Sequence, residues 1–245
     1  MRMELPRAAI GYGNELPDTQ VVFDMLKNRF KDSSLSTDQK VEQVRSDLWS
    51  NAAYAAQNRL RLYFYLQWPL IYAEKLKAQN PSLTDAEAVE AGWDVFSLLY
   101  LNLRQVEAVS DADWPVVKGK LGFGSYTSKP ATSSAAIAAD FPHHDYMLVV
   151  LSLITGNDQT PIFDLWGVKT TPAGKSQVAA MGLSPQPVKF YATRCADDFR
   201  GFQAVDLTQS NPLFPWPNEF KLSDNDNQAG TKQTTHNSYC KALTQ

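Results

Sequence analysis

Few side chains in this 245-residue sequence could take part in metal or catalytic chemistry, and Glu15 is the first of them. It stands in the turn Tyr12-Gly-Asn-Glu-Leu-Pro, just ahead of an amphipathic segment. Its carboxylate could be one ligand of a metal site whose other half lies elsewhere. It could equally be a loop carboxylate that stabilises the N-terminus of the next helix through the helix dipole. The local sequence leaves both interpretations open.

His143, His144 and Asp145 form the one dense group of potential ligands. Adjacent histidines point in different directions, whereas helical zinc sites use histidines four residues apart. We therefore expect Asp145 to be the N-cap of a buried helix that starts at Tyr146, with both histidines at its solvent-facing entrance. The third histidine, His236, lies in a polar tail, so we expect no complete zinc site in this chain alone.

Composition and motifs exclude several other classes of function. The net charge is −3 and the basic residues are scattered, so no nucleic-acid partner is expected. The most apolar stretch, residues 60–73, is too short for a membrane-spanning helix. Gly122-Phe-Gly is not followed by a third glycine at the offset of a dinucleotide fingerprint, and the sequence has no P-loop and no nucleophile elbow.

The elements that must position these side chains are mainly helical. Residues 36–39 and 84–87 both have the form of a capping box, which predicts two helix starts. Beyond the second box, apolar residues from Ala86 to Leu103, with Tyr100 among them, recur at spacings of three and four, so we expect one buried helix face. Residues 52–79 predict a helix covered on every side and kinked at Pro69.

Three further helices have clear ends. Residues 146–155 are followed by Gly156, and two segments that begin Thr-Pro end at Gly167 and Gly182. After Pro185 the sequence predicts one or two strands, beginning near residues 188–192, and extended loops. The prediction is a mainly α, bundle-like helical domain over residues 1–185 and an extended, loop-rich, partly β segment over residues 186–245 that packs on it.

Residues 145–172, which include Phe163-Asp-Leu-Trp-Gly-Val168, resemble the helical C-terminal part of enhancin-type zinc metallopeptidases. That family includes bacterial immunomodulating and accessory-colonisation-factor-like proteases directed at mucin-type glycoproteins. Residues 61–72 and 92–104 look like the family's two preceding core helices, and the resemblance extends over about residues 15–192. Nearly all the matching residues are packing residues, so the resemblance argues for the fold more strongly than for activity.

The resemblance also implies a role for Glu15. In such peptidases a His-Glu-x-x-His helix supplies two zinc ligands and the general base, and a glutamate further along the chain completes the site. Glu15, followed by Asp18-Thr-Gln and Val21-Val-Phe, is similar to the run that contains this glutamate. No His-Glu-x-x-His occurs in these 245 residues, so we expect zinc only in an intact parent and no activity from this chain alone.

The resemblance implies the C-terminal helical portion of a secreted, cell-surface or periplasmic zinc metallopeptidase with a glycoprotein substrate. Exposed aromatics such as Trp114, Tyr126 or Trp216 would then grip glycans, although such residues are more often part of a core. Residues 1–6 do not have the pattern of an export signal, so we expect any such signal to lie upstream.

One alternative is a non-catalytic binding or scaffold module that has kept the fold and lost the metal. Another is an all-helical cytosolic interaction protein whose resemblance is accidental. Cys195 and Cys240 could form a disulfide, which would indicate an oxidising compartment, or remain thiols, as a cytosolic protein would have them.

Overall fold

A computed structural model describes residues 19–49, 58–130, 142–193 and 202–215 of the chain. Within these residues the fold is mainly helical with one two-stranded sheet, which confirms the predicted fold class. Five residues singled out in the sequence lie outside the described residues: Glu15, Cys195, Trp216, His236 and Cys240. The division into two parts at residue 185 stays a prediction.

Two N-terminal helices, α2 (Thr19–Lys31) and α3 (Thr37–Trp49), pack against each other and against the long central helix. The start of α3 confirms the first predicted capping box. The Ser36 backbone N–H donates to Gln39 Oε1 at 2.8 Å, and the Gln39 N–H donates to Ser36 Oγ at 3.3 Å. Because each residue satisfies a backbone donor of the other, the local sequence alone fixes this boundary.

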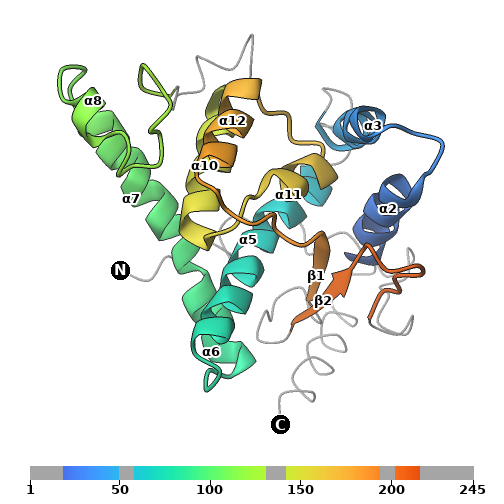
Figure 1. The fold of residues 1–245 in the computed structure, drawn as a ribbon. Helices are drawn as coiled ribbons and strands as arrows, with labels where there is room; N and C mark the ends of the chain where they lie inside the picture. Colours follow the sequence, from blue (N-terminus) through green and yellow to red (C-terminus); the bar gives the residue numbers. More distant parts are fainter. Residues whose placement is uncertain (1–18, 50–57, 131–141, 194–201, 216–245) are drawn as a thin grey trace.

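The central helix α5 (Asn58–Gln79; Figure 1) contacts most of the other elements. Pro69 lies in its interior. Phe64 is the centre of an aromatic cluster in the core. Its ring lies 5.3 Å from Trp68, 5.5 Å from Phe163 and 5.8 Å from Trp49, all near-perpendicular. Such edge-to-face pairs add to the gain from apolar burial, so α3, α5 and α11 (Thr160–Leu165) share one core.

The region after Thr84 is not one helix. It forms α6 (Asp85–Gly92) and α7 (Asp94–Ala108), which meet at Trp93. The break faces the backbone of α5, since a Cβ on Gly92 would lie only 3.1 Å from the Pro69 carbonyl carbon and closer still to its oxygen. The predicted apolar face is also displaced: Tyr100 is 50% exposed, whereas Val95 and Val106 are buried.

The helices of the second half end where the glycines predict. After the short α8 (Trp114–Val117) come α10 (Pro142–Thr155), α11 and α12 (Pro172–Ala180). Gly156, Gly167 and Gly182 have φ of 75°, 63° and 66°. A residue with a side chain rarely adopts this left-handed conformation, so glycine is the natural end of each helix.

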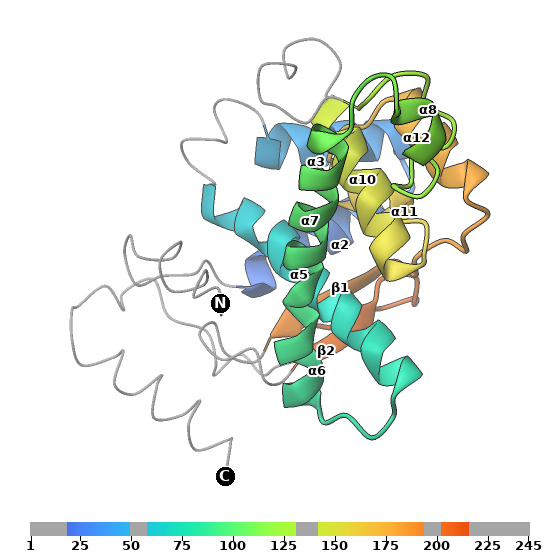
Figure 2. The ribbon, with the colours of Figure 1, turned by 90° about the vertical axis from the view of Figure 1, so that its left-hand side faces the viewer.

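The chain then forms an antiparallel pair, β1 (Lys189–Thr193) and β2 (Phe202–Asp206), with Phe190 opposite Val205. The first strand contacts both α5 and α2, so the strands lie against the helices and not apart from them. Figure 2 shows the pair beside the lower half of α5. Among the described residues, no helix is long and apolar enough to cross a membrane.

Candidate functional site

Glu15 itself is not described, but the helix that follows it is. This helix, α2, begins at Thr19, and its Phe23 side chain is fully buried. The Phe23 ring lies 5.5 Å from the ring of Phe190 in β1 and 5.5 Å from the ring of Phe214. Core packing therefore fixes the N-terminal half of the helix that follows the candidate metal ligand.

Two polar contacts fix the other end of α2. Arg29 donates from Nε and Nη2 to Asp47 Oδ2 of α3, at 3.2 and 3.1 Å. Lys31 Nζ donates to the Thr208 carbonyl at 3.1 Å, beyond β2. These groups are partly exposed, so each contact contributes little to stability, and their effect is mainly to set the orientation of the helix.

Asp145 does not cap the helix predicted to start at Tyr146. The helix α10 begins three residues earlier than that N-cap position, at Pro142, because proline is favourable in a first helical turn. Asp145 is 3% exposed and accepts hydrogen bonds from the Thr171 backbone N–H at 2.7 Å and from the Thr171 hydroxyl. Since Thr171 is the N-cap of α12, this carboxylate joins the starts of two helices.

Among the described residues, His144 and Asp145 belong to no metal-binding group. His144 Nδ1 lies 3.0 Å from the Lys169 carbonyl oxygen, so this nitrogen carries the proton in that hydrogen bond. The side chain of His143 is outside the described part. No group of three or more His, Cys, Asp or Glu that could hold a metal occurs among the residues that the structure describes.

The two described aromatics proposed to grip glycans belong to the core instead. Trp114 is 2% exposed, and its ring lies 6.1 Å from that of Phe123. Phe123 is stacked on Tyr146 at 5.8 Å and meets Tyr126 edge-on at 5.3 Å. Burial, with a smaller contribution from the charge of Asp145, raises the pKa of Tyr126. The prediction of exposed aromatics is thus wrong for Trp114, and the half-buried Tyr126 packs in the same cluster.

A buried polar connection that sequence reasoning missed joins α5 to β1. Gln67 Oε1 accepts from the Tyr191 backbone N–H at 2.8 Å, and Gln67 Nε2 donates to the Tyr191 carbonyl at 3.1 Å. The Tyr191 hydroxyl donates to Glu74, which also accepts from Lys189 Nζ at 2.6 Å. Burial, and secondly the Glu74 carboxylate, raise the pKa of Tyr191, so this hydroxyl remains protonated and acts as a donor.

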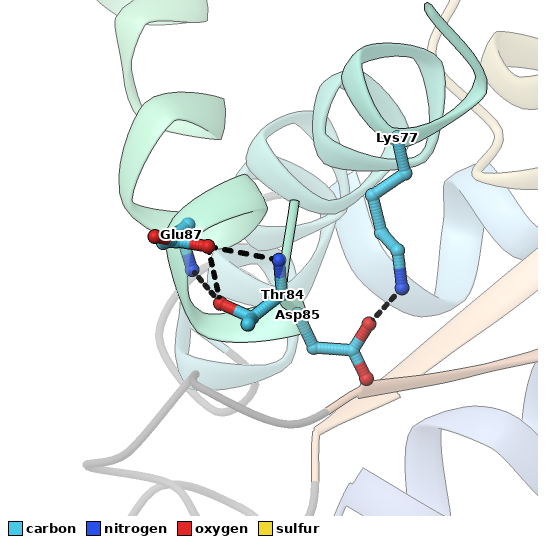
Figure 3. Close-up of polar contacts among 4 residues, drawn as sticks. All are labelled: Lys77, Thr84, Asp85 and Glu87. Carbon is cyan, nitrogen blue, oxygen red and sulfur yellow. Dashed lines mark hydrogen bonds and ion pairs between the residues drawn. The ribbon is translucent and has the colours of Figure 1, made fainter. Parts of the chain in front are cut away.

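A shallow hollow of about 520 Å³ lies between α6 and α7, and sequence reasoning missed it as well. It is lined by Glu87, Glu90 and Asp94 with two alanines. Glu87, Glu90 and Asp94 are three and four residues apart, and this spacing was the signal in the sequence for an acidic helix face. Figure 3 shows that Glu87 is engaged in the second predicted capping box, where its carboxylate accepts from the Thr84 N–H at 2.9 Å. The hollow is therefore acidic, and one of its three carboxylates has a structural role.

The described residues thus form a packed helical scaffold, with the candidate zinc ligand on the segment that leads into it. No family model matches the sequence. Comparison with single proteins and solved structures confirms the resemblance to enhancin-type metallopeptidases: the chain matches part of such an enzyme along most of its length.

The relative is the immunomodulating metalloprotease of Pseudomonas aeruginosa, which is 34% identical over 206 residues. The match takes in 84% of this chain and 21% of that protein, so the chain spans about a fifth of the length of its curated relative. A solved structure described as IMPa metallopeptidase in complex with T-antigen superposes with a TM-score of 0.68 at 27% identity. A second, with an O-glycopeptide, gives 0.67 at 30% identity. Each of these two superpositions covers 86% of this chain and 22% of the solved chain.

Proposed function

We propose that this chain is the C-terminal helical portion of a secreted zinc metallopeptidase that cleaves mucin-type glycoproteins. In this proposal the helices form a wall of the substrate cleft, and Glu15 is the third zinc ligand. One observation carries the proposal: 84% of the chain matches a metalloprotease in sequence, and 86% of it superposes on metallopeptidases solved with a T-antigen or an O-glycopeptide.

The chemistry of the available residues fits a ligand set divided between this chain and the rest of the enzyme. A catalytic zinc takes three protein ligands, and a glutamate oxygen is a suitable third ligand beside two histidines. The sequence contains no His-Glu-x-x-His, so in this proposal the two histidines and the general base belong to another part of the enzyme. When bound, zinc would polarise the scissile carbonyl and lower the pKa of a water molecule.

In this proposal the described residues contribute a firmly packed helix directly after the segment that contains Glu15. The helix that follows Glu15 is seated between Phe190 and Phe214 through Phe23. A ligand next to a well-packed element is easier to keep in the geometry that catalysis requires. The aromatic packing around α2 therefore supports the proposed role of Glu15.

The test compares the 245-residue chain with a longer polypeptide that contains it and a His-Glu-x-x-His helix. We expect bound zinc, measured by elemental analysis, and digestion of a mucin-type glycoprotein only from the longer form. In that form Glu15→Gln should abolish stoichiometric zinc binding, whereas the matched control Asp18→Asn should leave it unchanged. Zinc bound tightly by the short chain, or full zinc binding by the Glu15→Gln variant, would contradict the proposal.

The same comparison decides between the peptidase and the alternative of a non-catalytic module. A gene whose full reading frame encodes no His-Glu-x-x-His, and a product that binds glycopeptide without zinc or cleavage, would establish the module instead.

A further inference from the structure

The segment that follows β2 lies along α2 and contacts it near both ends. At the C-terminal end of α2, Lys31 Nζ donates to the Thr208 carbonyl at 3.1 Å. Toward the N-terminal end of α2, the Phe214 ring lies 5.5 Å from the Phe23 ring, at an interplanar angle of 54°. Figure 1 shows this segment beside α2. Residues 207–214 therefore run along the helix from one end toward the other, and we call them the strap.

The strap is attached to the sheet at its first residue. Leu207 is fully buried, and its backbone N–H donates to the Val188 carbonyl at 3.0 Å, which extends the pairing of β1 with β2. Asp206 closes the next turn, where its Oδ1 accepts from the Thr208 backbone N–H at 2.8 Å and from the Thr208 hydroxyl at 2.6 Å. Further along the strap, Pro212 is buried as well. The strap thus connects the sheet to α2 through defined contacts.

Phe23 packs on two rings that differ in burial. Phe190 of β1 is fully buried in the core and meets Phe23 at an interplanar angle of 67°. Phe214 of the strap is only half-buried. Removal of the Phe214 ring therefore leaves the core side of Phe23 in place. The contact of Lys31 with the strap is exposed and contributes little to stability, so the loss of Phe214 should loosen the N-terminal half of α2 without unfolding the core.

We propose that the strap positions α2 for zinc binding and that Phe214 is its positioning residue. This inference rests on the proposed function, since it assumes that Glu15, four residues before Thr19 in the sequence, is a zinc ligand. Phe214 acts in this proposal through Phe23 and touches neither the ion nor the substrate. Loss of a group that orients a metal ligand typically weakens metal binding by about 10–100-fold.

Amide hydrogen exchange of the 245-residue chain tests the strap itself. Phe214→Ala should speed the exchange of residues 23–27 by about tenfold or more relative to the amides of α10, because a helix that opens locally exchanges without global unfolding. Phe202→Ala is the matched control. Phe202 is also half-buried, and its ring packs on Tyr191 at 6.1 Å, on the sheet face opposite Phe190. Equal exchange of α2 in the two variants would overturn the strap.

Zinc binding by the longer polypeptide, measured by competition with a chelator, tests the positioning role. Phe214→Ala should raise the zinc Kd by about tenfold or more, and Phe214→Tyr, which keeps the ring, should restore most of the affinity. Phe202→Ala should change the Kd by less than about twofold. An unchanged Kd in Phe214→Ala would overturn the positioning role and leave the proposed function intact. Equal losses of affinity in both alanine variants would also overturn it, since general destabilisation would then be the cause. A wild-type longer form that binds no zinc would instead refute the proposed function.

Discussion

Replacement of Gly167 by alanine should separate two costs that usually occur together, backbone strain and steric overlap. Gly167 and Gly182 occupy the same position, two residues past the last residue of a helix and directly after its C-cap, with φ of 63° and 66°. Each donates its N–H to a carbonyl three residues earlier at 3.1 Å. They differ in their surroundings: a Cβ at Gly167 would lie 2.9 Å from Arg45 Cα, whereas one at Gly182 would meet nothing within 4 Å.

Gly182→Ala should therefore lower the free energy of unfolding only through the left-handed conformation, which costs about 1–2 kcal/mol. About 0.4–1 kcal/mol of this is returned because alanine restricts the unfolded chain. Gly167→Ala should lose the same net free energy of unfolding and should in addition force α3 away from the turn. Overpacking of this kind costs about 1–3 kcal/mol, so we expect Gly167→Ala to be less stable than Gly182→Ala by about this amount.

Urea unfolding of the wild type and both variants measures these free energies, provided that the m-value stays constant. The corresponding difference in Tm is about 2–4 °C for each kcal/mol in a chain of this size. Equal destabilisation by the two substitutions would show that the backbone of α3 yields at no cost, and would refute the claim that it packs rigidly on the turn.

Three further outcomes follow from the contacts of single residues. Gly92→Ala, which places a methyl group against the Pro69 carbonyl, should lower the free energy of unfolding by about 1–3 kcal/mol in urea titration, although its φ is not left-handed. Asp145→Asn, which removes one acceptor from Thr171, should cost about 1–3 kcal/mol by the same assay, since the group is buried. The hydrogen bonds of the capping box hold the Glu87 pKa below its ordinary value of 4.5, first through a backbone N–H. A lowered pKa gives stability that is complete above 4.5 and lost as pH falls through the folded-state value, so Glu87→Gln should approach wild-type stability only in acid.

Helix boundaries were predictable where neighbouring residues determine them. The box at Ser36 and Gln39 and the glycines that end α10, α11 and α12 depend on contacts a few residues apart. Such contacts satisfy backbone groups that any helix end exposes, whatever it packs against. The mainly helical fold class follows from the sum of these local signals.

The roles of Asp145 and Gln67 were not predictable, because their partners are distant in sequence. The Asp145 carboxylate bonds to Thr171, 26 residues away, and the Gln67 amide to Tyr191, 124 residues away. The apolar periodicity that indicated one helix between Ala86 and Leu103 is likewise interrupted by a tertiary contact. The break lies where Gly92 closely approaches α5. The apolar residues on both sides of Gly92 keep the helical spacing, so the periodicity does not indicate the break.

The helix that follows Glu15 packs on the same core that carries the family resemblance. The most specific part of the resemblance, Phe163 to Val168, places Trp166 against Phe190, with ring centroids 6.2 Å apart and nearly parallel. Phe190 in turn contacts Phe23 of α2, the helix that follows Glu15. One chain of aromatic contacts thus joins the family's packing block to the helix that follows the proposed zinc ligand. Residues that match the family for their packing thus also position the helix that follows the proposed ligand.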